Sequence, residues 1–213
     1  MVKAIIFDLD GTLADTLEDL ADTMNYCLGT LRLPVHSSEA YKMMIGTGSR
    51  ELCRKALPPE HADLTDKLLE MNLKRYAEHY MDKTKPYPGI VQTLAELRRR
   101  GLRLAVLSNK SGNFVKLISG EMFGPRCFEI IVGQQDGLPC KPDPAGVLDI
   151  LKQMEITPDE ALYVGDSGTD MATALAAGVT AVGVSWGFRD RGELLAAGAN
   201  RIIDKPGELL DLG

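Results

Sequence analysis

The sequence lacks the features that mark zinc, redox and membrane proteins. Its cysteines form no Cys-x-x-Cys or Cys/His cluster, so we expect reduced thiols and no zinc site. They are Cys27, Cys53, Cys127 and Cys140. The apolar run at the N-terminus (Ala4–Phe7) is too short for a signal peptide, and no stretch approaches the length that spans a membrane. These absences predict a cytoplasmic chain with no membrane partner.

An excess of basic residues is also missing. The 213 residues include 24 Lys and Arg against 30 Asp and Glu, a net charge of −6. Nucleic-acid binding depends on clustered cations, so this balance argues against a nucleic-acid partner. The basic run Arg98–Arg100 precedes Gly101 and is typical of a helix C-terminus with a glycine cap. With 45% apolar and 25% charged residues, the composition is that of an ordinary globular protein.

Short apolar, β-branched runs predict strands, and segments with helical spacing lie between the later ones. The predicted strands are Ala4–Phe7, Leu102–Leu107, Phe128–Val132, Ala161–Val164, Thr180–Val184 and Arg201–Ile203. The predicted helices are Ile90–Arg100, Phe114–Phe123, Ala145–Met154 and Met171–Ala177. This alternation predicts an α/β fold with a mostly parallel sheet and helices on both faces.

Residues 15–85 interrupt the alternation, because their periodicity is helical and no convincing strand occurs there. We interpret them as a helical insert that leaves the sheet domain after its first strand. The chain returns at Lys85–Gly89, whose prolines and glycine suit a turn. The predicted domains are therefore a core of residues 1–14 and 86–213 and an insert of residues 15–85.

Acidic pairs follow two of the predicted strands. Asp8 and Asp10 come directly after the first strand, and Asp166 and Asp170 follow Ala161–Val164. Ligands of open α/β sheets bind at the carboxyl ends of strands, where clustered carboxylates repel each other unless a cation joins them. Oxygen ligands without His or Cys suit Mg²⁺. Local Asx turns and a helix-dipole role for Asp170 are the alternatives.

Two further segments carry groups that bind phosphate. Ser108-Asn109-Lys110 follows the strand that ends at Leu107 and precedes a predicted helix, where hydroxyl, amide and backbone N–H groups form an anion pocket. Lys141 lies just before Asp143 and Pro144, which read as the N-cap and first residue of a helix. Taken singly, these segments also suit a helix cap and a solvated lysine.

Together these segments resemble, in order and in position after strands, the four motifs of the haloacid dehalogenase superfamily. The details are similar to its phosphoglycolate phosphatase branch, and the resemblance covers the whole chain. The details that carry the resemblance are Phe7-Asp8-Leu9-Asp10-Gly11-Thr12-Leu13, Tyr87-Pro88-Gly89, Ser108-Asn109-Lys110, Lys141-Pro142 and Gly165-Asp166-Ser167 with Asp170. The resemblance implies a Rossmann-like core with an inserted helical cap.

The resemblance also implies roles for the acidic residues. Asp8 would be the nucleophile and form an aspartyl-phosphate, and Asp10 would protonate the leaving group and then activate water. The Asp8 carboxylate, the Asp10 carbonyl and Asp166 would hold Mg²⁺, and Asp170 would order its water shell. Asp15 falls where the family has another acidic residue, but Asp15-Thr16-Leu17-Glu18 is typical of a capping box that starts a helix.

The remaining predicted roles concern the substrate. Ser108, Asn109 and Lys141 would hold the phosphoryl oxygens, with Ser108 and Lys141 counted as catalytic. The substrate-binding set is Thr12, Gly48, Arg50 and Asn109. Gly48 and Arg50 belong to a glycine-rich stretch in which Arg50 could meet a substrate carboxylate. Alternatively, Gly46 and Gly48 only separate two helices and Arg50 is solvated.

The expected activity is Mg²⁺-dependent hydrolysis of a small phosphorylated metabolite, with 2-phosphoglycolate as the best candidate. A β-phosphoglucomutase-like transferase, a pyrophosphatase and a non-catalytic phosphometabolite-binding protein remain open. A phosphonoacetaldehyde hydrolase would use a cap lysine such as Lys42, Lys55 or Lys67. A dehalogenase is rejected because members of that branch lack the aspartate found here at Asp10. The sequence leaves both a monomer and a homodimer possible.

Overall fold

Short runs of aliphatic and β-branched residues form a six-stranded sheet in the computed structural model, which describes residues 1–135 and 137–212. The strands run parallel in the order β5-β4-β1-β6-β7-β8. They are β1 (Ala4–Phe7), β4 (Arg103–Ser111), β5 (Ile130–Gln134), β6 (Ala161–Gly165), β7 (Thr180–Val184) and β8 (Arg201–Ile203). The α/β prediction with a mostly parallel sheet is confirmed, and β1, β7 and β8 have the predicted bounds.

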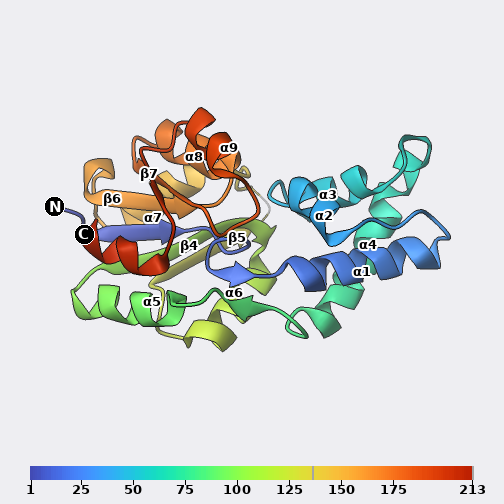
Figure 1. Ribbon diagram of the computed structural model, residues 1–213, viewed down its shortest axis with the longest axis horizontal. Helices are drawn as coiled ribbons and strands as arrows, with labels where there is room; N and C mark the ends of the chain where they lie inside the picture. Colours follow the sequence, from blue (N-terminus) through green and yellow to red (C-terminus); the bar gives the residue numbers. More distant parts are fainter. Residues whose placement is uncertain (136, 213) are drawn as a thin grey trace.

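Helices cover both faces of this sheet (Figure 1). They are α5 (Ile90–Arg99), α6 (Gly112–Phe123), α7 (Ala145–Gln153), α8 (Gly168–Ala176) and α9 (Arg191–Ala196), with short 3₁₀ segments η2 (Pro158–Glu160) and η3 (Pro206–Asp211). Within residues 1–135 and 137–212, no helix has both the length and the apolar character needed to cross a membrane.

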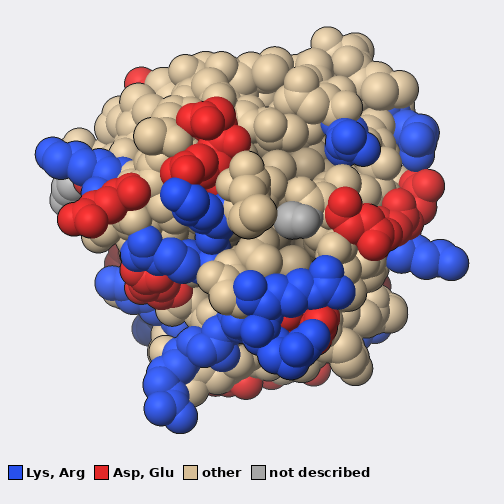
Figure 2. Space-filling model, turned by 90° about the vertical axis from the view of Figure 1, so that its left-hand side faces the viewer, with Lys and Arg blue, Asp and Glu red and all other residues tan. Residues whose placement is uncertain are grey.

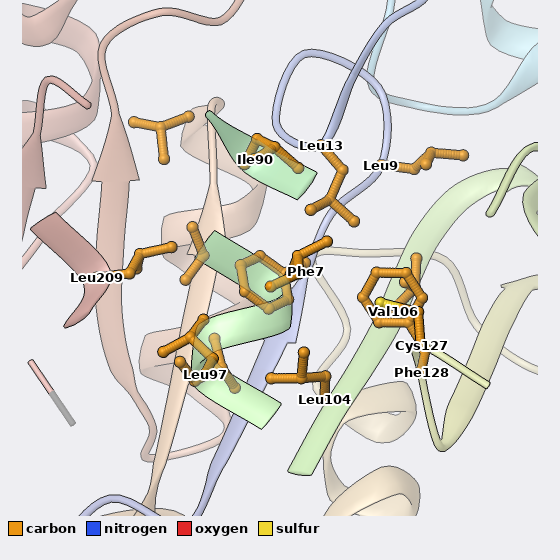
Figure 3. Close-up of a cluster of buried hydrophobic side chains, with 14 of the residues drawn as sticks. Phe7, Leu9, Leu13, Ile90, Leu97, Leu104, Val106, Cys127, Phe128 and Leu209 are labelled. Carbon is orange, nitrogen blue, oxygen red and sulfur yellow. The ribbon is translucent and has the colours of Figure 1, made fainter. Parts of the chain in front are cut away.

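Alternation along β1 divides the core into two layers. Phe7 is fully buried against α5, where Ile90 and Leu97 contact the same cluster (Figure 3). Ile6 points to the other face and packs with residues of α7, α8 and α9. Full burial of such a side chain contributes about 1.5–3 kcal/mol. Because both faces of β1 are covered, its four residues are all apolar and show no polar alternation.

Residues between the first two core strands form a separate helical unit, which we call the cap. It consists of α1 (Leu17–Thr30), α2 (Ser38–Met44), α3 (Ser49–Ala56), η1 (Pro59–Leu64) and α4 (Thr65–His79). The cap has its own apolar cluster, which includes Met24, Tyr41 and Leu68. Figure 1 shows it beyond the carboxyl end of β1, on the opposite side from both termini. The chain passes between core and cap in the antiparallel pair β2 (Ala14–Asp15) and β3 (Lys85–Pro86).

Three local predictions need correction. The N-cap residue of α1 is Thr16 and not Asp15, so the predicted capping box from Asp15 to Glu18 does not form. The Thr16 hydroxyl makes no cap hydrogen bond and donates to Asp10 at 2.6 Å. The strand β4 continues past Leu107 to Ser111 through a shift in register, because the chain pairs again with β5 at Gln134. Helix α7 begins at Ala145, where the helical spacing predicts it, but its N-cap is Pro144 and not Asp143.

The basic run at the end of α5 is compensated by acidic neighbours. Glu96 accepts hydrogen bonds from Arg99 and Arg100, and Glu129 pairs with Arg103. Figure 2 shows the face of the molecule away from the cap, where basic and acidic side chains lie beside each other. Gly101 follows the helix with φ of 87°, as the glycine-cap interpretation requires.

A buried carboxylate joins the cap to the returning linker. Asp19 in α1 is 3% exposed and accepts hydrogen bonds from the backbone N–H groups of Lys83 and Thr84 at 2.8–3.0 Å. The neighbouring Asp22 instead forms an exposed ion pair with the Lys83 Nζ.

Replacing Asp19 with Ala should therefore lower the free energy of unfolding by about 1.5–3 kcal/mol, because buried N–H groups lose a charged acceptor. Asp22→Ala is the matched control and should cost less than about 1 kcal/mol. Urea unfolding of both variants measures the difference. Equal costs would show that Asp19 contributes no more than a surface charge.

Candidate active site

The carboxyl ends of three neighbouring strands bring the predicted site residues together. Because β1 lies between β4 and β6, Asp8 after β1 has Ser108 of β4 on one side and Asp166 after β6 on the other. The chain order reverses at β1, which is the position where open α/β sheets bind ligands.

Three of the carboxylates form a compact cluster. One oxygen from each of Asp8, Asp166 and Asp170 lies within 4.8 Å of the others, and all three residues are buried. The Lys141 ammonium lies 3.1 Å from Asp8 Oδ2 and 2.6 Å from Asp170 Oδ1. One lysine therefore faces two of the three carboxylates, and Asp166 lacks a cationic partner within hydrogen-bonding distance among the described residues.

The oxygens of Asp170 are already occupied by donors. Its Oδ1 accepts from Lys141 and from the Tyr163 hydroxyl, and its Oδ2 accepts from the backbone N–H and the hydroxyl of Ser167. A carboxylate offers about four lone-pair sites, so little capacity is left for direct binding of a cation. This geometry favours a role for Asp170 in orienting Lys141 and the start of α8.

Asp166 keeps capacity for a ligand. Its Oδ1 accepts from the Thr12 hydroxyl at 3.2 Å, and its Oδ2 accepts from the Phe188 N–H at 2.8 Å. Gly11 has φ of 79°, and a Cβ there would overlap the Asp166 carboxylate. The glycine in the first motif therefore allows the β1 loop to approach Asp166 closely. Thr12 orients Asp166 and is fully buried, so it does not line the pocket described below.

Burial and mutual repulsion disfavour ionisation of these carboxylates. Burial raises the pKa of Asp8 to about 7, with Lys141 opposing and Asp170 and Asp10 adding to the shift. Burial, followed by the charges of Asp170 and Asp8, holds the pKa of Asp166 well above its usual range. For Lys141, burial acts to lower the pKa, but Asp170 and Asp8 outweigh it and raise the pKa.

The donor set fits a bound divalent cation. Asp8 and Asp166 offer only oxygen ligands, and one oxygen of each lies within 4.8 Å of the other. Hard oxygen ligands suit Mg²⁺ or Ca²⁺ better than zinc or copper. A cation at this position would also offset the burial and the repulsion that raise both pKa values.

Asp10 lies apart from this cluster and faces the cap. Its Oδ1 accepts from the Thr16 hydroxyl at 2.6 Å and from the Lys110 ammonium at 2.9 Å. Among the described residues, no hydrogen bond reaches its Oδ2. Lys110 is buried, and its ammonium lies 4.6 Å from the centre of the Tyr76 ring of α4. Two groups thus fix one oxygen of Asp10 and leave the other available.

A pocket of about 40 Å³ lies between the core and the cap. Its core wall contains Asp8, Asp10, Ser108, Asn109 and Lys110, and its cap wall contains Leu20, Ile45, Gly46, Gly48, Ser49 and Leu52. The core wall is polar and charged, whereas the cap wall consists of aliphatic side chains, backbone and one hydroxyl. Asp8 is shared by the carboxylate cluster and the pocket.

Asn109 and Lys141 are held more tightly than predicted. Asn109 Oδ1 accepts from the Lys141 N–H at 2.8 Å, and its Nδ2 donates to the carbonyls of Lys141 and Gly46 at 3.0 Å. Its amide therefore braces Lys141 and the cap. Lys141 does not project freely from a helix start, since its ammonium is paired within the carboxylate cluster. Ser108 lines the pocket, and its oxygen accepts a long hydrogen bond of 3.4 Å from the Lys110 N–H.

The structure brings Gly48 to the pocket but not Arg50. The Arg50 side chain is 62% exposed and pairs with Asp66 of α4 at 2.5 Å. Its position in the first turn of α3 directs it toward α4, whereas the adjacent Ser49 lines the pocket. Nor do the cap lysines considered for Schiff-base chemistry reach the pocket. These are Lys42, Lys55 and Lys67.

Two features of the site were not assigned from the sequence. Lys110 belongs to the Ser108-Asn109-Lys110 motif, yet its contact with Asp10 depends on the continuation of β4. The segment Ser185–Asp190 supports Asp166 through Phe188. It follows β7 as the other motifs follow their strands, so its position at a carboxyl end was the signal that could have identified it.

Comparison with known proteins agrees with this geometry. The family model for haloacid dehalogenase-like hydrolases matches residues 5–184. The chain belongs to this family. The predicted recognition is confirmed, and the chain is a phosphatase of the haloacid dehalogenase type.

Its relatives include enzymes named phosphoglycolate phosphatase. The one from Pseudomonas putida is 36% identical over 208 residues, covering 95% of this chain and 76% of that protein. The one from Chromobacterium violaceum is 36% identical over 217 residues, covering 99% of this chain and 96% of that protein. The crystal structure of a candidate phosphoglycolate phosphatase from Lactobacillus delbrueckii matches with a TM-score of 0.92 at 30% identity, covering 99% and 97% of the two chains.

The raised pKa of Asp8 predicts how Mg²⁺ should affect stability. Without a cation, Asp8 titrates near 7 in the folded chain and near 3.8 when unfolded. The folded chain then binds more protons between these values, so its free energy of unfolding falls as pH rises through them. A Mg²⁺ ion at this site would bind the ionised form of Asp8. The increase in Tm that saturating Mg²⁺ produces should therefore be larger at about pH 8 than at about pH 5.5.

Calorimetry at both pH values, with and without Mg²⁺, measures this difference. Asp166→Asn should lose most of the increase at high pH, because a neutral amide replaces a charged ligand. An equal increase at both pH values would contradict a site built on Asp8 and Asp166.

Proposed function

We propose that this chain is a Mg²⁺-dependent phosphomonoester hydrolase that acts on a small carboxylated substrate, with 2-phosphoglycolate as the best candidate. The observation that carries the proposal is the position of Asp8, which belongs to both the carboxylate cluster and the pocket. A group at this position contacts the cation on one side and the substrate on the other.

Asp8 is the proposed nucleophile. Its Oδ1 accepts from the Leu9 N–H at 2.7 Å, which fixes the carboxylate, and Lys141 lies beside Oδ2. Attack of a carboxylate oxygen on phosphorus forms an aspartyl-phosphate and releases the alkoxide of the ester. Mg²⁺, held by Asp8, the Asp10 carbonyl and Asp166, would neutralise charge on the transferring phosphoryl group.

Asp10 is the proposed acid and base. Thr16 and Lys110 hold its Oδ1, so Oδ2 is placed to give a proton to the leaving alkoxide. The resulting carboxylate then takes a proton from the water that attacks phosphorus, and Asp8 is regenerated with release of phosphate. Each of these steps conserves protons, since Asp10 loses one in the first half-reaction and regains one in the second.

The phosphoryl oxygens have donors available on the core side. The Ser108 hydroxyl lines the pocket, and Lys141 carries a proton beyond those it directs to Asp8 and Asp170. Such fixed donors stabilise the transition state of phosphoryl transfer. Asn109 contributes by holding Lys141 in place, because its own amide is engaged with backbone groups.

The cap wall favours a small anionic substrate over a sugar. Leu20, Ile45 and Leu52 offer no hydrogen bonds to the several hydroxyls of a hexose. Gly48 starts α3 without a side chain that could cap it, so the first N–H groups of this helix remain available to an anion. With Lys110 on the opposite wall, these groups suit the carboxylate of 2-phosphoglycolate. They would take the role predicted from the sequence for Arg50.

A substrate series tests the proposed function. With Mg²⁺ present, kcat/KM for 2-phosphoglycolate should exceed that for hexose phosphates and pyrophosphate by about tenfold or more. Asp8→Asn is the background control and should release no phosphate. A hexose phosphate that transfers its phosphoryl group to a second sugar phosphate would favour a mutase. If no ester releases phosphate, the chain is a non-catalytic protein that binds a phosphorylated metabolite.

The two half-reactions separate the roles of Asp8 and Asp10. With an activated aryl phosphate, whose leaving group needs no proton, Asp10→Asn should form phosphoenzyme but slow its hydrolysis by about 100-fold or more. Rapid quenching and mass spectrometry of the intact protein measure the phosphorylated fraction. Asp8→Asn should never carry the added phosphoryl mass. Equal slowing of both half-reactions in Asp10→Asn would exclude its role as the base.

A further inference from the structure

The segment between β7 and α9 reaches from the core into the cap. Phe188 is 8% exposed and packs in the apolar cluster of the cap with residues of α1 to α4. Its backbone N–H meanwhile donates to Asp166 in the core at 2.8 Å. The two sides of one residue thus contact the two parts of the chain that enclose the pocket.

Arg189, the next residue, binds the end of a cap helix. Its Nη1 donates to the carbonyl of Lys42, and its Nη2 donates to the carbonyl of Ile45 at 2.9 Å. These carbonyls lie in the last turn and at the C-cap of α2, where a cation is favoured by the helix dipole. The guanidinium stem is 9% exposed, and Nε lies 3.4 Å from Glu193. A planar fork can satisfy both carbonyls at once, which a lysine cannot.

The residues that Arg189 holds lead directly into the cap wall of the pocket. Ile45, Gly46 and Gly48 line the pocket, and the Gly46 carbonyl accepts from Asn109 at 3.0 Å. Gly46 and Gly48 have φ of 119° and 94°, so this loop depends on glycine for its shape and has little stiffness of its own. The contacts with Arg189 and Asn109 therefore fix a segment that would otherwise be free to move away from Asp8.

We propose that Arg189 is a positioning residue that holds the loop 45–48 over Asp8 and so sets the affinity for the part of the substrate beyond the phosphoryl group. The inference rests on the proposed function, because it assigns that part of the substrate to this loop. Arg189 lies outside the residues lining the pocket and acts through the carbonyls it binds.

The kinetic test compares Arg189→Gln with Arg191→Gln. Arg191 carries the same side chain two residues later, but it is 56% exposed and pairs with Asp204. If Arg189 holds the loop, its replacement lowers the fraction of substrate-free molecules that have a formed pocket, and KM rises by the inverse of that fraction. Arg189→Gln should raise KM for 2-phosphoglycolate by about 10- to 100-fold, the scale of a lost charged hydrogen bond. Its kcat should change by less than about threefold, because bound substrate itself keeps the loop over Asp8.

Arg189→Lys should give an intermediate KM, since one of the two carbonyls keeps a donor. Arg191→Gln should leave KM and kcat unchanged. A lower kcat with an unchanged KM in Arg189→Gln would overturn the proposal. It would show that Arg189 takes part in the chemical step or in the stability of the fold. Equal KM values in the two Gln variants would also overturn it.

Hydrogen exchange of the substrate-free protein tests the inference independently of the substrate. The amides of residues 46–49 should exchange faster in Arg189→Gln than in wild type, while those of β1 and β6 should be unchanged. If 2-phosphoglycolate fails in the substrate series, this result still decides whether Arg189 holds the loop. Unchanged exchange at residues 46–49 would show that it does not. The Mg²⁺-induced rise in Tm should persist, because the Phe188 N–H remains beside Asp166.

Discussion

The repulsion among Asp8, Asp166 and Asp170 is the constraint on which the rest of the site depends. Three carboxylates with oxygens within 4.8 Å of one another are buried at the carboxyl edge of one sheet. An uncompensated charge in such a place costs several kcal/mol, so each neighbour of the cluster has an electrostatic role. Lys141 compensates Asp8 and Asp170, and the hydroxyls of Tyr163 and Ser167 complete the shell of Asp170. What is left uncompensated lies between Asp8 and Asp166, where a cation fits.

The same arrangement explains why the chemistry needs two separate acidic environments. Asp8 lies within the cluster beside Lys141, which favours its ionised form, and a cation in the proposed site would do the same. Asp10 points away from the cluster and is held by Thr16 and Lys110, which belong to the linker side of α1 and to β4. Two carboxylates only two positions apart in the chain thus face the same pocket with different partners. The proposed division into nucleophile and acid–base group follows from these partners.

Much of the core could be predicted from the sequence because its strands are apolar on both faces. The runs Ala4–Phe7 and Thr180–Val184 match β1 and β7 to the residue. The position of Asp8 and Asp166 after strands predicts that they lie together, and their oxygens are within 4.8 Å of each other. Local capping patterns were less informative. The hydroxyl of Thr16 could satisfy either the helix start or Asp10, and only the folded chain brings Asp10 within 2.6 Å. The spacing of residues in the sequence does not predict such a competing partner, because it comes close only in the folded chain.

The contacts between the cap and the core could not be predicted from the local sequence pattern. Arg50 has the chemistry of a carboxylate ligand, but the rotation of α3 directs it to Asp66, and the adjacent Ser49 takes the place at the pocket. Arg189 has no motif around it, and its partners are carbonyl groups, which every residue type provides equally. Backbone recognition of this kind leaves no signature in the partner's sequence. It can be inferred only after the fold has placed α2 against the β7 loop.

Close packing around Asp166 links the proposed cation site to the contacts that the β7 loop makes with the cap. A Cβ at Gly11 would overlap the Asp166 carboxylate, and a Cβ at Gly187 would overlap both Asp166 and the Gly11 carbonyl. The β1 loop and the β7 loop therefore both pack directly against Asp166. The β7 loop continues directly into Phe188, within the cap cluster, and Arg189, on the α2 carbonyls. A displacement of the cap that carried this loop with it would have to move the Phe188 N–H away from Asp166. The position of the cap and the geometry of the proposed cation site thus share one rigid segment, which places the substrate wall and the Mg²⁺ ligand in a fixed relation to Asp8.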